Sequence, residues 1–143
     1  GAAAIVPIVA ERSQRSPEAR AVRRVERWRQ IAVAACEQCG RNHVPEIAEI
    51  MPLSAWLDRD AESIEALMLV PDAVTSYATA IKKGHPRFII VGPEGGFTAP
   101  ERDEAERRGV TLVRFGSRIL RAETAALAAL SVIVAIEDDA APT

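Results

Sequence analysis

Two segments of this sequence carry residue types that suit the binding of a ligand. Residues 92–97 read Gly-Pro-Glu-Gly-Gly-Phe, and residues 115–125 read Phe-Gly-Ser-Arg-Ile-Leu-Arg-Ala-Glu-Thr-Ala. Glycines let a ligand approach the backbone closely, and Pro93 stiffens the first loop. In the second loop, charged side chains surround an Ile-Leu pair, which a plain connection between elements does not need. These charged residues are Arg118, Arg121 and Glu123.

Both loops follow apolar, β-branched runs, residues 88–91 and 110–113. Such runs are typical of buried strands in a parallel sheet. The loops therefore lie at the carboxyl ends of strands, where open α/β sheets bind their ligands. The first loop is not a Walker A loop, because no Gly-Lys-Ser/Thr follows it. By itself it fits a plain strand-to-helix turn equally well.

A helix is predicted directly after the first loop. Thr98 is a good N-cap residue, Glu101 stands three residues later as its capping-box partner, and Pro100 is tolerated in the first turn. Gly109 is expected just beyond the end of this helix.

The rest of the chain alternates short apolar runs with helical patterns. Strands are predicted at residues 3–9, 46–50 and 64–70. Helices are predicted at residues 17–39, 55–59, 75–83 and 125–136, the first of them capped by Ser16, with Pro17 as its first residue and Gly40 after its end. A turn is predicted at Pro52-Leu53, and the tail at residues 137–143 is expected to fray. This alternation predicts an α/β fold with a mostly parallel sheet and flanking helices. One domain is the default at 143 residues, and 48% hydrophobic content supports a core.

Charge is unevenly distributed, although the net charge is only −2. Through residue 41 there are eight arginines and four glutamates. A local basic patch of this kind can contact phosphates, whereas a solvated helix face with Glu–Arg pairs is the favoured interpretation for most single arginines.

Metal, redox and membrane functions are not favoured. Cys36 and Cys39 lie at the end of the first predicted helix, where free thiols are the simplest interpretation, although a dithiol enzyme is a weaker alternative. No metal-ligand spacing involves His43 or His85. The apolar run 125–136 is shorter than the ~20 residues that span a bilayer.

Several motifs together resemble those of one protein family. The two loops, with Glu-Arg-Ser at 11–13, Glu-Arg-Trp at 26–28, Glu-Gln-Cys-Gly-Arg at 37–41 and Val-Pro at 44–45, resemble RsmE-type ribosomal RNA (uridine-N3)-methyltransferases of the SPOUT superfamily. The resemblance implies a SPOUT domain with a C-terminal deep trefoil knot. It also implies a cytoplasmic homodimer that assembles through the knot region and the C-terminal helix. Residues 1–143 would be an N-terminally truncated catalytic domain, without the family's PUA-like RNA-binding barrel.

The activity implied by this resemblance is methyl transfer from S-adenosylmethionine to N3 of a uridine in 16S ribosomal RNA of the small ribosomal subunit, without a metal. The expected cofactor-binding residues are Val70, Gly92, Pro93, Gly95, Gly96, Phe115, Gly116, Ile119, Leu120, Arg121, Thr124 and Ala125. The expected RNA-binding residues are Arg12, Arg23, Arg27, Gln38 and Arg41.

The candidates for catalysis are three arginines and two glutamates. Arg12, Arg41 or Arg121 would stabilise the anion that develops on uracil, and Glu94 or Glu123 would accept its proton. Of these, Arg12, Arg121 and Glu94 are the first choices. Purely structural roles compete with these catalytic ones. Glu94 would brace its loop, Glu123 would cap a helix, and Arg118 or Arg121 would form an ion pair. The alternative function is a non-catalytic RNA-binding module that uses the basic first helix.

Overall fold

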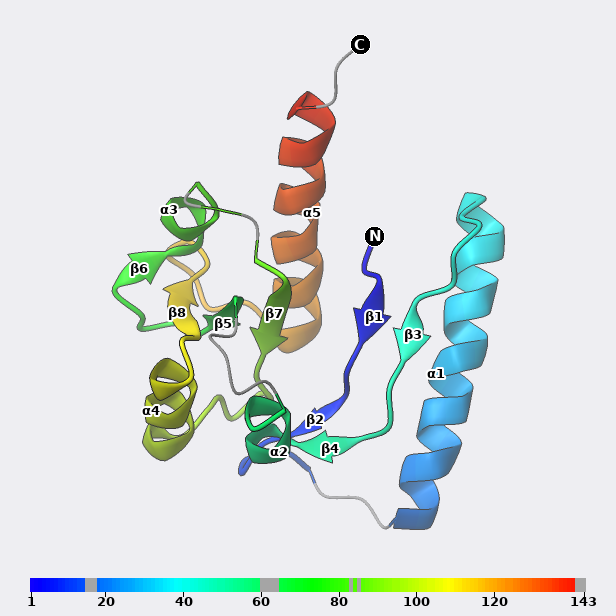
Figure 1. Cartoon of the computed structure of the whole chain (residues 1–143), viewed down its shortest axis with the longest axis horizontal. Coiled ribbons are helices and arrows are strands. Elements are labelled where there is room, and N and C mark those ends of the chain that lie inside the picture. The colour runs from blue at the N-terminus through cyan, green and yellow to red at the C-terminus, as the bar shows by residue number, and fades with distance from the viewer. Residues whose placement is uncertain (15–17, 60–64, 83, 85, 141–143) are drawn as a thin grey trace. The chain divides into compact units, whose positions relative to one another are not determined.

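The computed structural model describes residues 1–14, 18–59, 65–82, 84 and 86–140 of the chain (Figure 1). The predicted cap and first-turn residues of the first helix, Ser16 and Pro17, lie outside the described residues. The chain forms two compact units. The N-terminal unit comprises residues 1–9 and 14–56, and the C-terminal unit comprises residues 10–13 and 57–143.

The N-terminal unit contains two short parallel strand pairs. They are β1 (Ala4–Ile5) with β3 (Glu46–Ile47) and β2 (Ile8–Val9) with β4 (Met51–Pro52). The single strand predicted at residues 3–9 is therefore divided, with Pro7 between its halves. The turn predicted at Pro52 was wrong, because Pro52 pairs with Val9 and this tertiary pairing overrides the local turn preference.

Helix α1 (Glu18–Cys39) packs in this unit through a narrow apolar stripe of side chains. Val25, Ala32 and Cys36 are buried, and Val25 and Ala32 pack against Ile47. The side chain of Val22, in contrast, is 63% exposed because it lies beside the stripe. Gly40 has a φ of 71°, which confirms the predicted glycine stop of α1.

The C-terminal unit is built on a four-stranded parallel sheet. Its spatial order is β6 (Thr75–Ser76), β8 (Thr111–Arg114), β5 (Ala66–Leu69) and β7 (Phe88–Val91). The last strand in sequence, β8, thus lies between β6 and β5. The α/β class and the mostly parallel sheet are confirmed. A parallel order of this kind places the loops after β5, β7 and β8 at one edge.

The remaining helices are α2 (Leu53–Leu57), α3 (Tyr77–Ile81), α4 (Ala99–Arg107) and α5 (Ala122–Ala140). Residues 75 and 76 were predicted as helical but form β6, because β8 offers them a parallel partner. Ser76 then caps α3 by accepting a hydrogen bond from Thr79 N–H. Helix α5 extends through part of the tail predicted to fray from residue 137.

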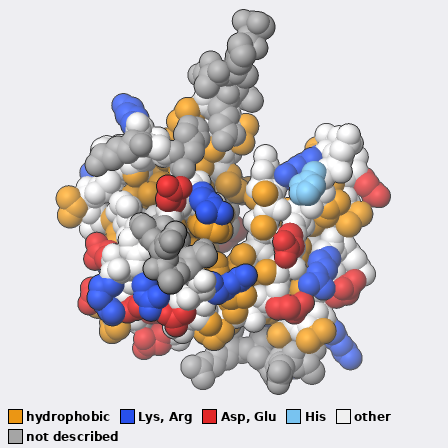
Figure 2. All heavy atoms as spheres, viewed as in Figure 1, with side chains coloured by type: hydrophobic (Ala, Val, Ile, Leu, Met, Phe, Trp, Pro, Cys, Tyr) orange, Lys and Arg blue, Asp and Glu red, His pale blue; other side chains and the backbone are white. Residues whose placement is uncertain are grey.

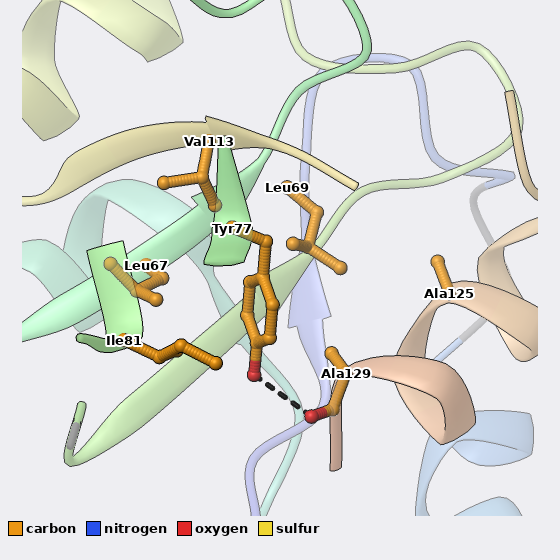
Figure 3. Packing of buried hydrophobic residues seen from close by; sticks show 7 residues of the cluster. All are labelled: Leu67, Leu69, Tyr77, Ile81, Val113, Ala125 and Ala129. Atoms are coloured by element: carbon orange, nitrogen blue, oxygen red, sulfur yellow. Dashed lines mark hydrogen bonds between the residues drawn. The ribbon is translucent and has the colours of Figure 1, made fainter. Parts of the chain in front are cut away.

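The core of the C-terminal unit lies between the sheet and two helices (Figure 3). Leu67, Leu69 and Val113 of the sheet pack against side chains of α3 and α5. The helical members of this cluster are Tyr77, Ile81, Ala125 and Ala129. The alanines of α5 allow the helix backbone to approach the sheet closely. None of the helices in the described part of the chain is long and apolar enough to cross a membrane.

Candidate functional site

A pocket of about 300 Å³ opens at the carboxyl ends of β5, β7 and β8. This is the edge at which the two glycine loops were expected to meet. Its lining residues are Leu69, Val70, Pro71, Val91, Gly92, Pro93, Glu94, Gly96, Phe115, Gly116, Ser117, Arg118, Ile119, Leu120, Arg121, Ala122 and Ala125. The walls are mainly aliphatic, and three charged side chains lie among them. Pockets that bind small molecules combine these features.

The first loop is folded tightly on itself. Gly96 N–H donates a 2.8 Å hydrogen bond to the Pro93 carbonyl, and Gly96 has a φ of 66° that favours glycine. Gly92 lies against the buried ring of Phe97, so that a Cβ at position 92 would lie 2.9 Å from a ring carbon. The glycine at 92 thus allows Phe97 to anchor the loop from within.

Helix α4 begins where this loop ends, as predicted. The Glu101 carboxylate accepts a 2.8 Å hydrogen bond from Thr98 N–H, which satisfies a donor at the helix start. Glu101 also accepts a 2.7 Å hydrogen bond from Glu11 N–H. The Thr98 hydroxyl, which is buried, lies 3.1 Å from the carboxylate of Glu11. Residues 10–13 are therefore attached to the start of α4.

Two arginines hold carbonyl groups of the first loop. Arg12 Nη1 donates a 2.8 Å hydrogen bond to the Gly95 carbonyl. Arg102 of α4 donates from Nε to the Phe97 carbonyl at 3.2 Å. Arg102 Nη1 also donates to both carboxylate oxygens of Asp72, at 2.9 and 3.1 Å. The hydrogen bond from Arg102 lowers the pKa of the Asp72 carboxyl below its usual value.

The second loop runs from β8 to α5 along the pocket. Gly116 has a φ of 71°, which favours glycine at the turn out of the strand. Phe115 packs on Tyr77 with ring centroids 5.1 Å apart, so the aromatic wall of the pocket rests on the core. The side chain of Ile119 is 82% exposed although it lines the pocket. An apolar side chain in this position can cover a bound ligand.

Most of the predicted cofactor residues lie in the pocket lining. The ten that do are Val70, Gly92, Pro93, Gly96, Phe115, Gly116, Ile119, Leu120, Arg121 and Ala125. Gly95 and Thr124 are not part of the lining. A Cβ at Gly95 would meet the Arg12 side chain, 3.1 Å from its Cβ. Thr124 is exposed, near the start of α5.

The predicted catalytic residues are placed differently from one another. Glu94 and Arg121 both line the pocket and are exposed. Arg12 is exposed too, but it contacts the loop at Gly95 rather than lining the pocket. Two residues that hold the loops, Arg102 and Asp72, were missed from the sequence. They are 30 positions apart, and no local pattern connects them.

The other predicted RNA-binding residues belong to the N-terminal unit. Arg23, Arg27 and Gln38 are exposed on α1. Arg41 is half-buried after the end of α1, where its guanidinium lies beside Gly1. The same unit holds the two cysteines, which are free thiols: Cys36 is buried and Cys39 is exposed.

No group of three or more His, Cys, Asp or Glu side chains could hold a metal ion in the part of the chain that the structure describes. The pocket's own charged groups are a carboxylate, Glu94, and two guanidinium groups, Arg118 and Arg121. Such groups can bind a zwitterionic or anionic ligand and can move or stabilise charge.

Known proteins are similar to this chain in sequence. The model of a family described as an RNA methyltransferase domain matches residues 1–134. The ribosomal RNA small subunit methyltransferase E of Bacillus subtilis is 35% identical, over 93% of this chain and 56% of that protein. The chain spans about half the length of the curated relatives it matches.

Solved structures share the fold as well. A ribosomal RNA small subunit methyltransferase E from Neisseria gonorrhoeae, bound to S-adenosylmethionine, superposes with a TM-score of 0.84 at 35% identity. The match covers 95% of this chain and 56% of that one. A Legionella pneumophila protein in complex with S-adenosylmethionine gives a TM-score of 0.79 at 31% identity, over 94% and 55% of the respective chains.

Proposed function

This chain belongs to the RNA methyltransferase family, and we propose that it carries the catalytic site of an S-adenosylmethionine-dependent enzyme that methylates N3 of a uridine in 16S ribosomal RNA. The family membership agrees with the resemblance carried by the two glycine loops. The observation that carries the proposal is the pocket itself, because both loops line it at the carboxyl edge of the sheet.

The residues of the pocket fit the proposed cofactor. A volume of about 300 Å³ lies within the range of small-molecule sites. Nothing lies within 4 Å of a Cβ built on Gly96 or Gly116, so the backbone at both positions borders open space. The aliphatic walls suit an adenine ring. Arg118 and Arg121 suit the carboxylate group of the methionine part.

The bound cofactor would supply a methyl group already activated by the positive sulfonium. The protein must then hold the uracil in line with that methyl group and exclude water. The tight turn at Gly96 and the buried Phe97 ring hold the first loop rigidly. Ile119, exposed at the pocket, would cover the site on its other side.

N3 of uracil loses a proton when it accepts the methyl group. Arg121 would stabilise the negative charge that develops on the uracil oxygens, and Glu94 would accept the proton. Both side chains line the pocket. Arg12 would hold the first loop through Gly95 and present its remaining N–H groups to the RNA.

The proposal extends to the topology and assembly of the chain. The segment from β8 through α5 would form the deep trefoil knot of SPOUT domains, and α5 would pair with its copy in a homodimer. Leu127, Leu130 and Val134 give α5 an exposed apolar face, and Figure 2 shows hydrophobic side chains at the surface below the grey C-terminal end. We expect the protein in the cytoplasm, because its proposed substrate belongs to the small ribosomal subunit.

Calorimetric titration with S-adenosylmethionine tests the cofactor, and ATP is the control because it shares the adenosine. Saturable binding of one cofactor per chain, without a response to ATP, is expected. Methyl transfer to small-subunit RNA would then be followed by mass spectrometry of the nucleosides, with N3-methyluridine as the product. A folded chain that binds neither the cofactor nor its product would overturn the proposal.

Measurements of kcat distinguish the roles of the two arginines of the second loop, Arg118 and Arg121. Arg121→Ala is expected to lower kcat about a hundredfold, the size of effect seen when one group that stabilises an anion is removed. Arg118→Ala is the matched control in the same loop and should change kcat far less. Equal losses in the two variants would assign Arg121 no special role.

A second candidate function is a non-catalytic RNA-binding module that uses α1. The exposure of Arg20, Arg23, Arg24 and Arg27 along that helix favours it. This function predicts RNA binding that weakens steeply with salt and needs no S-adenosylmethionine. Replacing Arg23, Arg24 and Arg27 by Ala would abolish such binding, whereas the methyltransferase proposal requires cofactor affinity to survive.

A further inference from the structure

The loops after β5 and β7 both line the pocket, and one arginine connects them. Val70 and Pro71 of the β5 loop lie in the lining and are followed directly by Asp72. The β7 loop contributes residues up to Gly96 and is followed directly by Phe97. Arg102 binds the carboxylate of Asp72 and the carbonyl of Phe97.

Arg102 does this from outside the pocket. It is not a lining residue, and its side chain is 28% exposed on the first turns of α4. The helix beneath it is fixed by the hydrogen bond from Thr98 N–H to Glu101. A planar guanidinium with several donors can serve both partners at once, whereas a lysine ammonium has no comparable fork.

We propose that Arg102, together with Asp72, is a positioning residue for the cofactor: it holds the β5 and β7 loops at the separation that the ligand requires. This inference rests on the proposed function of the pocket. A loop that is ordered before binding avoids an entropic cost at the moment of binding, so the pair raises cofactor affinity without touching the cofactor. Asp72 contributes only through Arg102.

The chain provides a matched control on the same helix. Arg108, in the turn that ends α4, pairs with Asp58 and also donates a 2.9 Å hydrogen bond to Glu104. Asp58 and Asp72 are both exposed aspartates, and each is bound by an arginine of the α4 region. Neither Asp58 nor Arg108 lines the pocket. Asp58→Asn and Asp72→Asn therefore each remove one carboxylate charge from an exposed ion pair with an arginine of the α4 region.

The experiment is a titration of this chain and its variants with S-adenosylmethionine, accompanied by thermal unfolding. Asp72→Asn is expected to raise the Kd about twofold to fivefold, the range for a lost ion pair at the protein surface. Asp58→Asn should leave the Kd unchanged while lowering the Tm by a similar small amount. Asp72→Glu, which keeps a carboxylate within reach of Arg102, should restore most of the affinity.

A double-mutant cycle tests the route of the effect. Arg102→Gln is expected to weaken binding more than Asp72→Asn, because it also removes the contact to the Phe97 carbonyl. In the Arg102→Gln background, Asp72→Asn should cause no further loss. Equal effects of Asp72→Asn and Asp58→Asn on Kd, or the same cost of Asp72→Asn in both backgrounds, would overturn the inference.

Binding of S-adenosylmethionine by the unchanged chain tells a failure of this inference from a failure of the proposed function. If the unchanged chain does not bind S-adenosylmethionine, the proposed function fails and the positioning role fails with it. If it binds and the Asp72 and Arg102 variants bind equally well, the inference alone fails.

Discussion

The hydroxyl of Tyr77 donates a 2.8 Å hydrogen bond to the backbone carbonyl of Ala129, 52 residues later in the sequence (Figure 3). Tyr77 begins α3 and Ala129 lies in the middle of α5, so this bond joins the two helices on one face of the sheet. The Tyr77 side chain is 2% exposed, and its ring packs against Phe115 at the pocket. The position of α5 is thus connected to the shape of the pocket.

Tyr77→Phe is expected to destabilise the fold by about 1 kcal/mol, because it leaves the buried carbonyl of Ala129 without this partner. Ser131→Ala is the matched control. Its hydroxyl also donates a 2.8 Å hydrogen bond to a carbonyl of α5, that of Leu127, but at an exposed position where water can replace it. Denaturant unfolding of both variants measures the difference. Equal free energies of unfolding would show that burial of the Tyr77 bond adds nothing.

The free energy of unfolding should fall at alkaline pH because Tyr77 ionises. Burial raises the pKa of Tyr77 from 10.0 to about 12. The unfolded chain therefore loses this proton at lower pH than the folded chain does. Its contribution is fully present below about pH 10 and disappears as the pH rises through about 12. A difference of two pKa units corresponds to roughly 3 kcal/mol.

Tyr77 is the only tyrosine of the chain, so ultraviolet absorbance can follow its ionisation directly. We expect an absorbance midpoint near pH 12 in the folded state and near pH 10 in denaturant. The alkaline loss of stability should be smaller in Tyr77→Phe. A midpoint near 10 under native conditions would show that the hydroxyl is not held in the core.

Gly92 and Gly95 belong to the same loop but should respond differently to an added methyl group. A Cβ at Gly92 would lie 2.9 Å from the ring of Phe97, which is buried and cannot move away. Gly92→Ala is therefore expected to cost 1–3 kcal/mol of stability, the usual range for overpacking, and to weaken cofactor binding at least about tenfold.

Gly95→Ala is the comparison variant. Its Cβ would lie 3.1 Å from the Cβ of Arg12, a looser contact than the one at Gly92, and a shift of a few tenths of an ångström relieves it. We expect stability within about 0.5 kcal/mol of the unchanged chain. Cofactor affinity should fall about threefold or less, as Arg12 loosens from the Gly95 carbonyl. Thermal unfolding and calorimetry measure both quantities. A larger loss at Gly95 than at Gly92 would contradict the assigned packing.

Leu127→Arg is expected to dissociate the proposed homodimer. Leu127 is 69% exposed on α5, and a charged side chain in an apolar interface is strongly unfavourable. Val74→Arg is the control, because Val74 is an apolar residue that is 93% exposed and does not belong to α5. Light scattering should report a halved mass for Leu127→Arg alone. A monomeric unchanged chain, or no change in mass for Leu127→Arg, would exclude α5 as the interface.

The sequence alone determined the local features of the site. The glycine loops, the capping of α4 at Thr98 and Glu101, and the strand runs before both loops depend on a residue and its near neighbours, so periodicity and turn chemistry were sufficient. The parallel α/β class followed from the alternation of elements. Even the edge at which the loops gather was predictable, because parallel strands share a carboxyl end.

The tertiary structure decided which distant groups meet. Pro52 pairs with Val9 instead of forming a turn, and residues 75–76 join β8 instead of a helix, because an available strand partner outweighs a weak local preference. The contact of Gly95 with Arg12, and the attachment of Asp72 to Phe97 through Arg102, depend on the order of strands in the sheet. No spacing in the sequence encodes that order, since it arises from packing across many residues at once.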